Sequence, residues 1–458
     1  MVILTNNLNT TTLTMRTQRL LIIIFTIGLL TACAPIEELL YNNLWPTHTP
    51  SATKPPSATP APITPSPTNA PTTTPSITPS PTLSPTRKPT YTPWPSITPA
   101  VAAPTVPTVP PYVRIKPDNI PDSINPLTGL VVPNPNLLDR LPIAVKVALF
   151  PLHTLPPAGI SRADHVYEYY LEYGLTRLMA IFYGNDVARV GPVRSARIFD
   201  AHLVQMYNAA FVFGGAHKDE GTPRDVYGYL EEALDPNLFV NGLIFECTPY
   251  LCRDESISSY NNIFGNTHII SQLITQRGID NIRPNLANNY FYAPEKRNQE
   301  QANQIFLFYS SQSYSYWYYQ PGPHQYFRYQ GISYETEDYI KLIDRYTGTP
   351  ITAENIVVLL VDHEFYYHSS STEIIDIQLT GSGKAYVFRD GQVFQASWER
   401  TDENKPLAIR TPNGSPLDLK PGTTFFQIMS TNPQPTQKGQ AWIFEFEPPE
   451  EDEQNGEQ

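Results

Sequence analysis

Two arginines and a serine stand together in the segment Arg194-Ser195-Ala196-Arg197. The turn dipeptide Gly191-Pro192 precedes this segment, and apolar residues at helical spacing follow over residues 196–208, so we expect a turn that leads into a helix. A helix N-terminus offers free N–H groups and a partial positive charge, and guanidinium groups bind carboxylate or phosphate through paired hydrogen bonds. The segment, with its Ser195 hydroxyl and with Arg177 on a preceding strand, therefore predicts a site for an anionic ligand.

A structural role for these arginines is the competing interpretation. Acidic residues lie near them in the sequence at Asp164, Glu168, Glu172 and Asp200. Buried arginine–carboxylate networks often serve packing alone. Complete pairing with full burial would indicate such a structural role, whereas an open concave site would indicate binding.

Acidic residues also recur at even spacing, at Asp164, Glu168 and Glu172, along a segment of strand composition. Residues at even spacing share one face of a strand, and two carboxylates can act as acid and base in glycoside cleavage. His217 follows a short apolar strand and two glycines, where it could act as a general base at a loop rim. The same patterns equally describe a solvent-facing strand and an ordinary turn. Ser195 stands in no Gly-x-Ser-x-Gly elbow, so the sequence gives serine hydrolysis little support.

Cys247 and Cys252 are separated by four residues, which outside the cytoplasm predicts a small-loop disulfide. A metal pair is less favoured, because no second Cys/His pair with suitable spacing appears. The segment Asp362-His363-Glu364 with His368 matches no metal-binding pattern. No phosphate loop or dinucleotide fingerprint is present, so we expect neither a metal nor a cofactor.

The N-terminus has the features of an export signal. Two arginines precede an apolar run at residues 20–30, which is shorter than the about 20 residues that a membrane-spanning helix needs. The run ends in Leu30-Thr31-Ala32-Cys33, which resembles the lipobox of bacterial lipoproteins. The resemblance implies cleavage after residues 1–32 and a membrane-anchoring lipid on Cys33; an uncleaved anchor with an incidental cysteine is the alternative. Met15 would start a tighter signal peptide than Met1.

A stalk rich in Pro, Ser and Thr occupies residues 33–111. Proline fixes φ and lacks an N–H group, so we expect extended polyproline II mixed with coil. At about 3.1 Å per residue such a segment reaches on the order of 200 Å. A tether of this length could carry the body through a cell wall.

Charge and composition limit what the rest of the chain can bind. The net charge of −12 argues against a general nucleic-acid binder and against a body that adheres to anionic lipid. Residues 447–458 are mostly acidic and polar, which predicts a disordered tail. Between the stalk and this tail, residues 112–300 and 301–446 contain ample core material for two regions.

The pattern of the body predicts an α+β fold with few helices and a mostly β C-terminal part. The first region should contain strands 164–173 and 175–183 as a hairpin, helix 196–208, strand 210–213 and helix 267–276. The second should contain strand 356–362, a hairpin-like pair 374–379 and 384–389 around Gly381-Ser382-Gly383, strand 392–398 after the turn Asp390-Gly391, and strand 423–429.

Aromatic residues are concentrated in Tyr314-Ser315-Tyr316-Trp317-Tyr318-Tyr319, followed by Tyr326, Phe327 and Tyr329. Exposed aromatic rings stack on sugars or anchor protein partners, whereas rings on alternate strand positions form core. We expect about half of these rings to be core.

Several strings of the body carry a family resemblance. They are Asn125-Pro126-Leu127-Thr128-Gly129-Leu130, Ala158-Gly159-Ile160-Ser161-Arg162-Ala163-Asp164-His165-Val166-Tyr167-Glu168, Gly174-Leu175-Thr176-Arg177, Gly191-Pro192-Val193-Arg194-Ser195-Ala196-Arg197, Gly381-Ser382-Gly383-Lys384-Ala385, and Asp390-Gly391 ahead of Trp398. Together they resemble the YerB-like family of bacterial lipoproteins, a family of unknown function with an N-terminal and a C-terminal region. The likeness covers nearly all of residues 123–430.

The resemblance implies an α+β layered sandwich with mixed sheets, a lipid anchor and a place in the cell envelope. It brings no established activity and no catalytic residues. One segment departs from the family: where a basic-Pro-His-Asn segment is expected, this chain has Ser259-Tyr260-Asn261-Asn262-Ile263-Phe264. If relatives use that histidine in chemistry, this chain lacks it.

Three functions remain open. The favoured prediction is a non-enzymatic lipoprotein on the outer face of the cytoplasmic membrane that binds an anionic or glycan-like envelope ligand, or a protein partner, near Arg194 and Arg197. The second is a hydrolase of cell-wall glycan or peptide that uses Asp164, Glu168 or His217, and the third is a structural surface protein. A hydrolase needs two carboxylates, or a carboxylate and a histidine, in one cleft.

Overall fold

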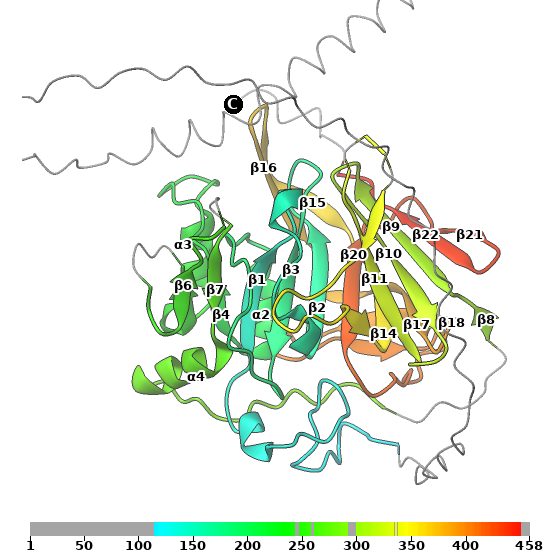
Figure 1. Ribbon diagram of the computed structural model, residues 1–458, viewed down its shortest axis with the longest axis horizontal. Helices are drawn as coiled ribbons and strands as arrows, with labels where there is room; N and C mark the ends of the chain where they lie inside the picture. Colours follow the sequence, from blue (N-terminus) through cyan, green and yellow to red (C-terminus); the bar gives the residue numbers. More distant parts are fainter. Residues whose placement is uncertain are drawn as a thin grey trace, which may run out of the picture. The chain divides into compact units, whose positions relative to one another are not determined.

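A computed structural model describes residues 114–449 (Figure 1), apart from 243–246, 258–260, 292–298, 334 and 337. The predicted signal peptide, Cys33, the stalk and most of the acidic tail lie outside these residues. Within them the chain forms many strands and few helices, as the sequence predicts.

The first sheet has 11 strands, and strands from both regions of the body meet in its middle. β2 (His165–Tyr170) pairs antiparallel with β3 (Thr176–Phe182) and parallel with β20 (Thr424–Met429). Residues on both sides of the predicted boundary near residue 300 therefore share one sheet. The other strands are β1 (Ile143–Ala148), β4 (Ala210–Phe213) and β5 (Phe239–Asn241) beyond β3, and β14 (Asn355–Leu360), β17 (Gly381–Arg389), β18 (Gln392–Arg400), β19 (Ala408–Arg410) and β8 (Glu300–Gln301) beyond β20.

A second sheet of seven strands packs on the first. Figure 1 shows its strands β9, β10 and β11 in front of strands of the first sheet. Trp317 of β10 is fully buried, with its ring centroid 4.7 Å from that of Phe425 in β20. The second sheet consists of β9 (Gln304–Ser310), β10 (Ser313–Gln320), β11 (Gln325–Gly331), β12 (Tyr339–Lys341), β13 (Thr352–Ala353), β21 (Thr436–Lys438) and β22 (Ala441–Glu445).

Helix α2 (Asp200–Tyr207) covers the opposite face of the first sheet. The hydroxyl of Tyr207 lies 2.6 Å from Nδ1 of His165 and 2.6 Å from the hydroxyl of Tyr167, both on β2. Helix, sheet and sheet thus form successive layers, which confirms the predicted α+β layered sandwich. The smaller elements are α3 (Val226–Ala233), α4 (Thr267–Gln276), the ribbons β6 (Leu251–Arg253) with β7 (Ile263–Gly265) and β15 (His363–Ser369) with β16 (Thr372–Ile377), and the 3₁₀ turns Pro135–Leu138, Leu152–Thr154, Ile160–Arg162 and Pro236–Leu238.

Several predicted elements are confirmed, and β4 and α4 have the predicted bounds. The helix expected from residue 196 begins only at Asp200, so this start was wrong. Backbone pairing explains the delay: the N–H of Arg194 donates to Lys146 in β1 at 3.0 Å, and that of Ala196 donates to Gly215 at 2.8 Å. These bonds hold the segment extended, and an extended segment cannot wind into a helix.

The expected hairpin of residues 374–379 with 384–389 was also wrong. β16 pairs with β15, whereas β17 pairs with β14 and β18. The tight turn at Asp390 and Gly391, with φ of 54° and 73°, returns the chain directly from β17 into β18. Two positive φ angles match the turn type that joins hairpin strands, so this local turn and not the glycines at 381 and 383 sets the partner of β17.

Candidate functional site

The structure brings the predicted arginines together at the start of β3 and in the segment ahead of α2. Arg177 of β3 is nearly buried and donates from Nη1 to the backbone oxygen of Ser195 at 2.7 Å. Arg197 donates from Nε to Glu172 at 2.7 Å and also forms an ion pair with the other carboxylate oxygen through Nη2. Arg194 is half-buried in the same segment. We call Arg177, Arg194 and Arg197 the arginine centre.

A fully buried cluster of polar side chains lies beside the arginine centre, and it was not predicted from the sequence. Nζ of Lys146 in β1 lies 2.7 Å from Oδ1 of Asp200 and 2.5 Å from the hydroxyl of Tyr169, which also donates to Asp200. The other Asp200 oxygen accepts the backbone N–H of Arg197 at 2.8 Å. A lysine inside the apolar run Ile143-Ala144-Val145-Lys146-Val147-Ala148 was the available signal, because a buried strand seldom carries an unpaired charge.

Electrostatics in this region follow from burial and from the closeness of like charges. Burial lowers the pKa of Lys146 to about 7, although Asp200 opposes the shift. Burial, followed by repulsion from Arg197 and Arg194, lowers the pKa of Arg177 to about 9. Burial raises the pKa of Glu172, but attraction to Arg197 outweighs it and the net shift is downward. Glu172 is therefore held as a carboxylate that balances part of the positive charge.

The predicted catalytic acids do not converge. Glu168 forms a 2.8 Å ion pair with Arg328 between the two sheets. Asp164 accepts the backbone N–H groups of Tyr183 at 2.6 Å and Gly184 at 2.9 Å. Four residues of strand separate Asp164 and Glu168 by about 13 Å, whereas paired carboxylates in glycosidases lie about 5 to 9.5 Å apart.

Neither the burial of the three acids nor the position of His217 fits a catalytic cleft. Asp164, Glu168 and Glu172 are buried, so the interpretation as a solvent-facing strand was wrong. Burial raises the pKa of Asp164 to about 6, against the backbone hydrogen bonds that it accepts. His217 lies on an exposed loop after β4, and within the described part of the chain no hydrogen bond or ion pair joins it to these acids.

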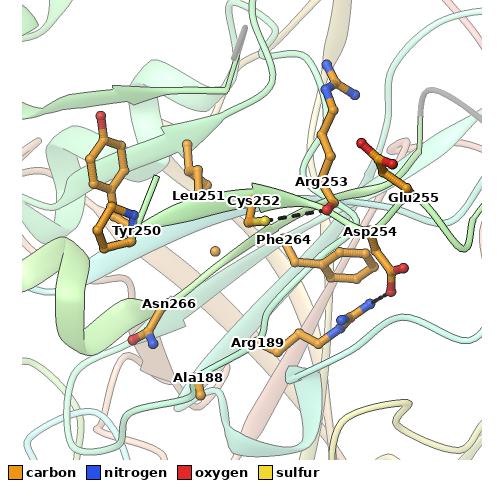
Figure 2. A pocket seen from close by; sticks show the side chains of 12 residues that line it. Ala188, Arg189, Tyr250, Leu251, Cys252, Arg253, Asp254, Glu255, Phe264 and Asn266 are labelled. Atoms are coloured by element: carbon orange, nitrogen blue, oxygen red, sulfur yellow. Dashed lines mark hydrogen bonds and ion pairs between the residues drawn. The ribbon is translucent and has the colours of Figure 1, made fainter. Parts of the chain in front are cut away.

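A surface pocket of about 390 Å³ lies elsewhere, along β6 and β7 (Figure 2). Its wall includes Arg189, whose guanidinium lies 3.9 Å from the centroid of the Phe264 ring and pairs with Asp254. Cys252, joined to Cys247 in a disulfide, also lines it. None of the predicted ligand-binding residues is among those that line this pocket.

The aromatic segment divides as expected. Trp317, Tyr319 and Tyr326 are buried between the sheets. Tyr314 is also buried, but on the outer face of the second sheet, where its hydroxyl donates to the backbone oxygens of Ser333 and Thr336. Tyr316, Tyr318, Phe327 and Tyr329 are half-buried or exposed on the same outer face. The prediction that about half of these rings are core is confirmed.

Among the described residues, no helix combines the length and the apolar character that crossing a bilayer requires. In the same part of the chain, no group of three or more His, Cys, Asp or Glu side chains is arranged to hold a metal ion.

An α+β sandwich in which an N-terminal and a C-terminal region share one sheet is thus the class of protein that the fold defines. Both regions match family models: residues 127–280 match "Protein of unknown function (DUF3048) N-terminal domain", and residues 305–426 match the C-terminal domain of the same family. The chain belongs to this family.

The similar proteins agree with this assignment. The chain is 25% identical to "Putative lipoprotein YerB" of Bacillus subtilis (strain 168) over 316 residues, which cover 68% of this chain and 89% of the relative. The crystal structure of the YerB protein from Bacillus subtilis matches with a TM-score of 0.54 and 25% identity, over 67% of this chain and 96% of that one. The resemblance expected from the sequence is confirmed.

Proposed function

We propose that this chain is a lipoprotein, anchored through a lipid on Cys33 at the outer face of the cytoplasmic membrane, whose body binds an anionic envelope ligand without catalysis. The lipobox-like segment before Cys33 supports the anchor. The printed name of the relative YerB also describes a lipoprotein. The Cys247–Cys252 disulfide suits an oxidising compartment outside the cytoplasm.

The convergence of three arginines is the observation that carries the binding proposal. Arg177 comes from β3, while Arg194 and Arg197 come from the segment before α2. Their mutual repulsion contributes to the lowered pKa of Arg177. A bound phosphate or carboxylate would relieve that repulsion through charge-assisted hydrogen bonds. Glu172 supplies part of this negative charge through its ion pair with Arg197.

A catalytic role has less support. Hydrolysis would require a pair of titratable groups around one reacting atom. Asp164 is instead bound by backbone N–H groups, and Glu168 is held by Arg328 between the two sheets. The proposal therefore assigns recognition and not turnover to this body.

The test removes the carboxylate of Glu172, which would compete with a bound anion for Arg197. In the full-length chain in detergent, Glu172→Gln removes the negative charge that Arg197 holds and should tighten the binding of inorganic phosphate or a muropeptide about tenfold in calorimetry. Arg194→Gln should weaken it by a similar factor. Glu399→Gln is the matched control, because Glu399 pairs with Arg410 at 3.0 Å on a distant strand.

A structural role gives a different result. If the arginines only hold the fold together, Glu172→Gln lowers the melting temperature, and no anion binds to the wild type or to this variant. That outcome would reject the anion site and direct the search to protein partners.

A further inference from the structure

The outer face of the second sheet carries two neighbouring rows of aromatic side chains, which we call the aromatic face. The strand register places Phe306 of β9, Tyr316 of β10 and Tyr329 of β11 in one row. Tyr318 of β10 and Phe327 of β11 form the next row, two residues nearer to the β10–β11 turn. All five are half-buried or exposed. Because side chains alternate along a strand, they point away from the first sheet and take no part in the core.

The rings of the first row stand upright, and their polar ends are available. The ring planes of Tyr316 and Tyr329 differ by 7°, with centroids 4.6 Å apart, and Phe306 stacks on the other side of Tyr316 at 5.2 Å. Neighbouring strands are about 4.8 Å apart, so rings that stack across strands lie perpendicular to the sheet. Among the described residues, no hydrogen bond engages the hydroxyl of Tyr316, Tyr318 or Tyr329. The aromatic face therefore offers apolar rings beside hydrogen-bond donors.

Charge does not decide what the aromatic face binds. Exposed Glu335, Asp338 and Glu445 border it together with Lys341 and Lys438. Because charges of both signs are present, Coulombic attraction favours neither an anionic nor a cationic partner. An uncharged partner with apolar rings and free carbonyl oxygens fits the aromatic rings and the hydroxyl donors best.

A segment of this kind comes directly before the body in the chain. Residues 104–111 read Pro-Thr-Val-Pro-Thr-Val-Pro-Pro and carry no charge. They fall outside the described residues, and their composition predicts polyproline II. The carbonyl oxygens of polyproline II have no hydrogen-bond partner within the segment. Proline-rich segments in this conformation dock on aromatic surfaces of recognition domains.

The described part of the chain begins close to one end of the second sheet. Nε of Arg114 donates to Asp418 at 3.0 Å. Two residues further along, Lys420 donates to the backbone oxygen of His324 in the β10–β11 turn. The row of the aromatic face that contains Tyr318 is the one nearer to this turn. The proline-rich segment therefore joins the body near the edge of the aromatic face.

The prolines of the segment match the spacing of the strands. Residues 111–113 span about 10 Å when extended, which is the usual distance between packed sheets, so Pro104, Pro107 and Pro110 remain for the outer face. Polyproline II has three residues per turn, which places these three prolines on one side at intervals of about 9.3 Å. Two strand spacings measure about 9.6 Å. Successive prolines would therefore meet every second strand as the segment crosses the aromatic face.

We infer that the segment 104–111 docks on the aromatic face as polyproline II, with its prolines against the rings and its carbonyl oxygens accepting from the tyrosine hydroxyls. A few residues connect the segment to Arg114, which gives it an effective concentration on the order of 1 mM at the face. A segment whose free peptide binds with a Kd of about 0.1 mM would then be mostly docked. Docking would fix the end of the stalk, and with it the direction in which the body leaves the stalk. The inference uses neither the arginine centre nor the lipid on Cys33.

The test compares two tyrosines of similar exposure by hydroxyl-radical labelling of the full-length chain in detergent, read by mass spectrometry. Tyr318 on the aromatic face is 39% exposed, and Tyr366 on the separate β15–β16 ribbon is 45% exposed. With the segment docked, Tyr318 should be labelled about fivefold more slowly than Tyr366. Pro104→Gly/Pro107→Gly/Pro110→Gly removes the proline rings and the bias to polyproline II, and it should bring the two rates to within about twofold of each other.

A matched control replaces three other prolines of the stalk. In Pro71→Gly/Pro75→Gly/Pro79→Gly the substituted residues are four apart and do not share one side of polyproline II. Tyr318 should stay protected in this control, and both variants should keep the wild-type melting temperature. A synthetic peptide of residues 102–113, added at about 1 mM to the variant at 104, 107 and 110, should restore the protection.

Three results would overturn the inference. Equal labelling of Tyr318 and Tyr366 in the wild type would show that the aromatic face is uncovered. Protection of Tyr318 that persists after the substitutions at 104, 107 and 110 would show that another occupant, such as a second copy of the chain, covers it. A peptide that restores no protection at about 1 mM would show that these substitutions act from a distance. None of these measurements involves anion binding, so this inference and the proposal for the arginine centre can fail independently.

Discussion

The guanidinium of Arg328 lies 2.8 Å from the carboxylate of Glu168, and both side chains are buried between the two sheets. Arg328 belongs to the C-terminal region and Glu168 to the N-terminal region. Thr176 donates to the same carboxylate at 3.1 Å, and Gln330 accepts from the guanidinium at 2.7 Å. The two regions are thus joined by a buried charge pair as well as by the shared sheet.

Breaking this pair from one side should destabilise the body strongly. Arg328→Met leaves the carboxylate of Glu168 buried without its cation, and we expect the free energy of unfolding to fall by about 3 to 5 kcal/mol. Adding Glu168→Leu removes the unpaired buried charge and should recover most of this loss. Denaturant unfolding monitored by tryptophan fluorescence measures both values.

The exposed pair of Arg410 with Glu399 is the control for that experiment. Arg410→Met breaks a partly exposed ion pair and should change stability by about 1 kcal/mol at most. A loss for Arg328→Met that is no larger than this would show that water reaches Glu168.

The buried carboxyl of Asp164 should give the protein a specific pH dependence. Burial raises its pKa from 3.8 to about 6 in the folded state. Between these values the folded protein holds a proton that the unfolded chain has released, so this group's stabilising contribution is complete below pH 4 and is lost as the pH rises to about 6. The loss amounts to about 3 kcal/mol for a shift of two units.

Asp164→Asn tests this directly, because asparagine keeps an oxygen for the N–H groups of Tyr183 and Gly184 but does not titrate. The difference in unfolding free energy between wild type and variant should change between pH 4 and pH 6 and stay flat above pH 7. A difference that is constant over the whole range would show that Asp164 has an ordinary pKa in the folded protein.

Patterns confined to a few neighbouring residues allowed correct prediction of the local elements. The run at 210–213 and the breaker-free stretch at 267–276 became β4 and α4, and Asp390-Gly391 joined β17 to β18. Each of these depends on propensity or turn geometry within one segment. The α+β class followed from the succession of such segments, whereas the layered sandwich was implied by the family resemblance.

Contacts between residues that are far apart in the chain could not be predicted from the sequence. Glu168 and Arg328 are 160 residues apart, and alternation tells which face of a strand is buried but not what covers it. The even spacing of Asp164, Glu168 and Glu172 therefore suggested a common site, although each meets a different partner. Lys146 was overlooked because its partners, Tyr169 and Asp200, come from two other elements.

The proposed lipid anchor predicts where the protein fractionates. Cys33→Ser removes the thiol that would carry the lipid, and a single remaining apolar run at residues 20–30 is short for a stable span. We expect the variant to move from the membrane fraction to the soluble or secreted fraction, or to persist as an uncleaved precursor of higher mass. Immunoblots of both fractions, with Cys247→Ser as control, measure this. Unchanged fractionation and mass would contradict lipidation at Cys33.

Removing the Cys247–Cys252 disulfide should affect the β6–β7 ribbon more than the core. The bond closes a short loop with a sequence separation of 5, for which the chain-entropy relation gives a stabilisation of about 2 kcal/mol. In Cys247→Ser/Cys252→Ser we therefore expect faster amide exchange at Leu251 and Phe264, while β2 and β20 keep wild-type protection, because the centre of the first sheet is held by its own packing. Hydrogen exchange read by mass spectrometry resolves the two regions. Equal acceleration in the ribbon and in the central strands would show instead that the ribbon and the sheets unfold as one unit.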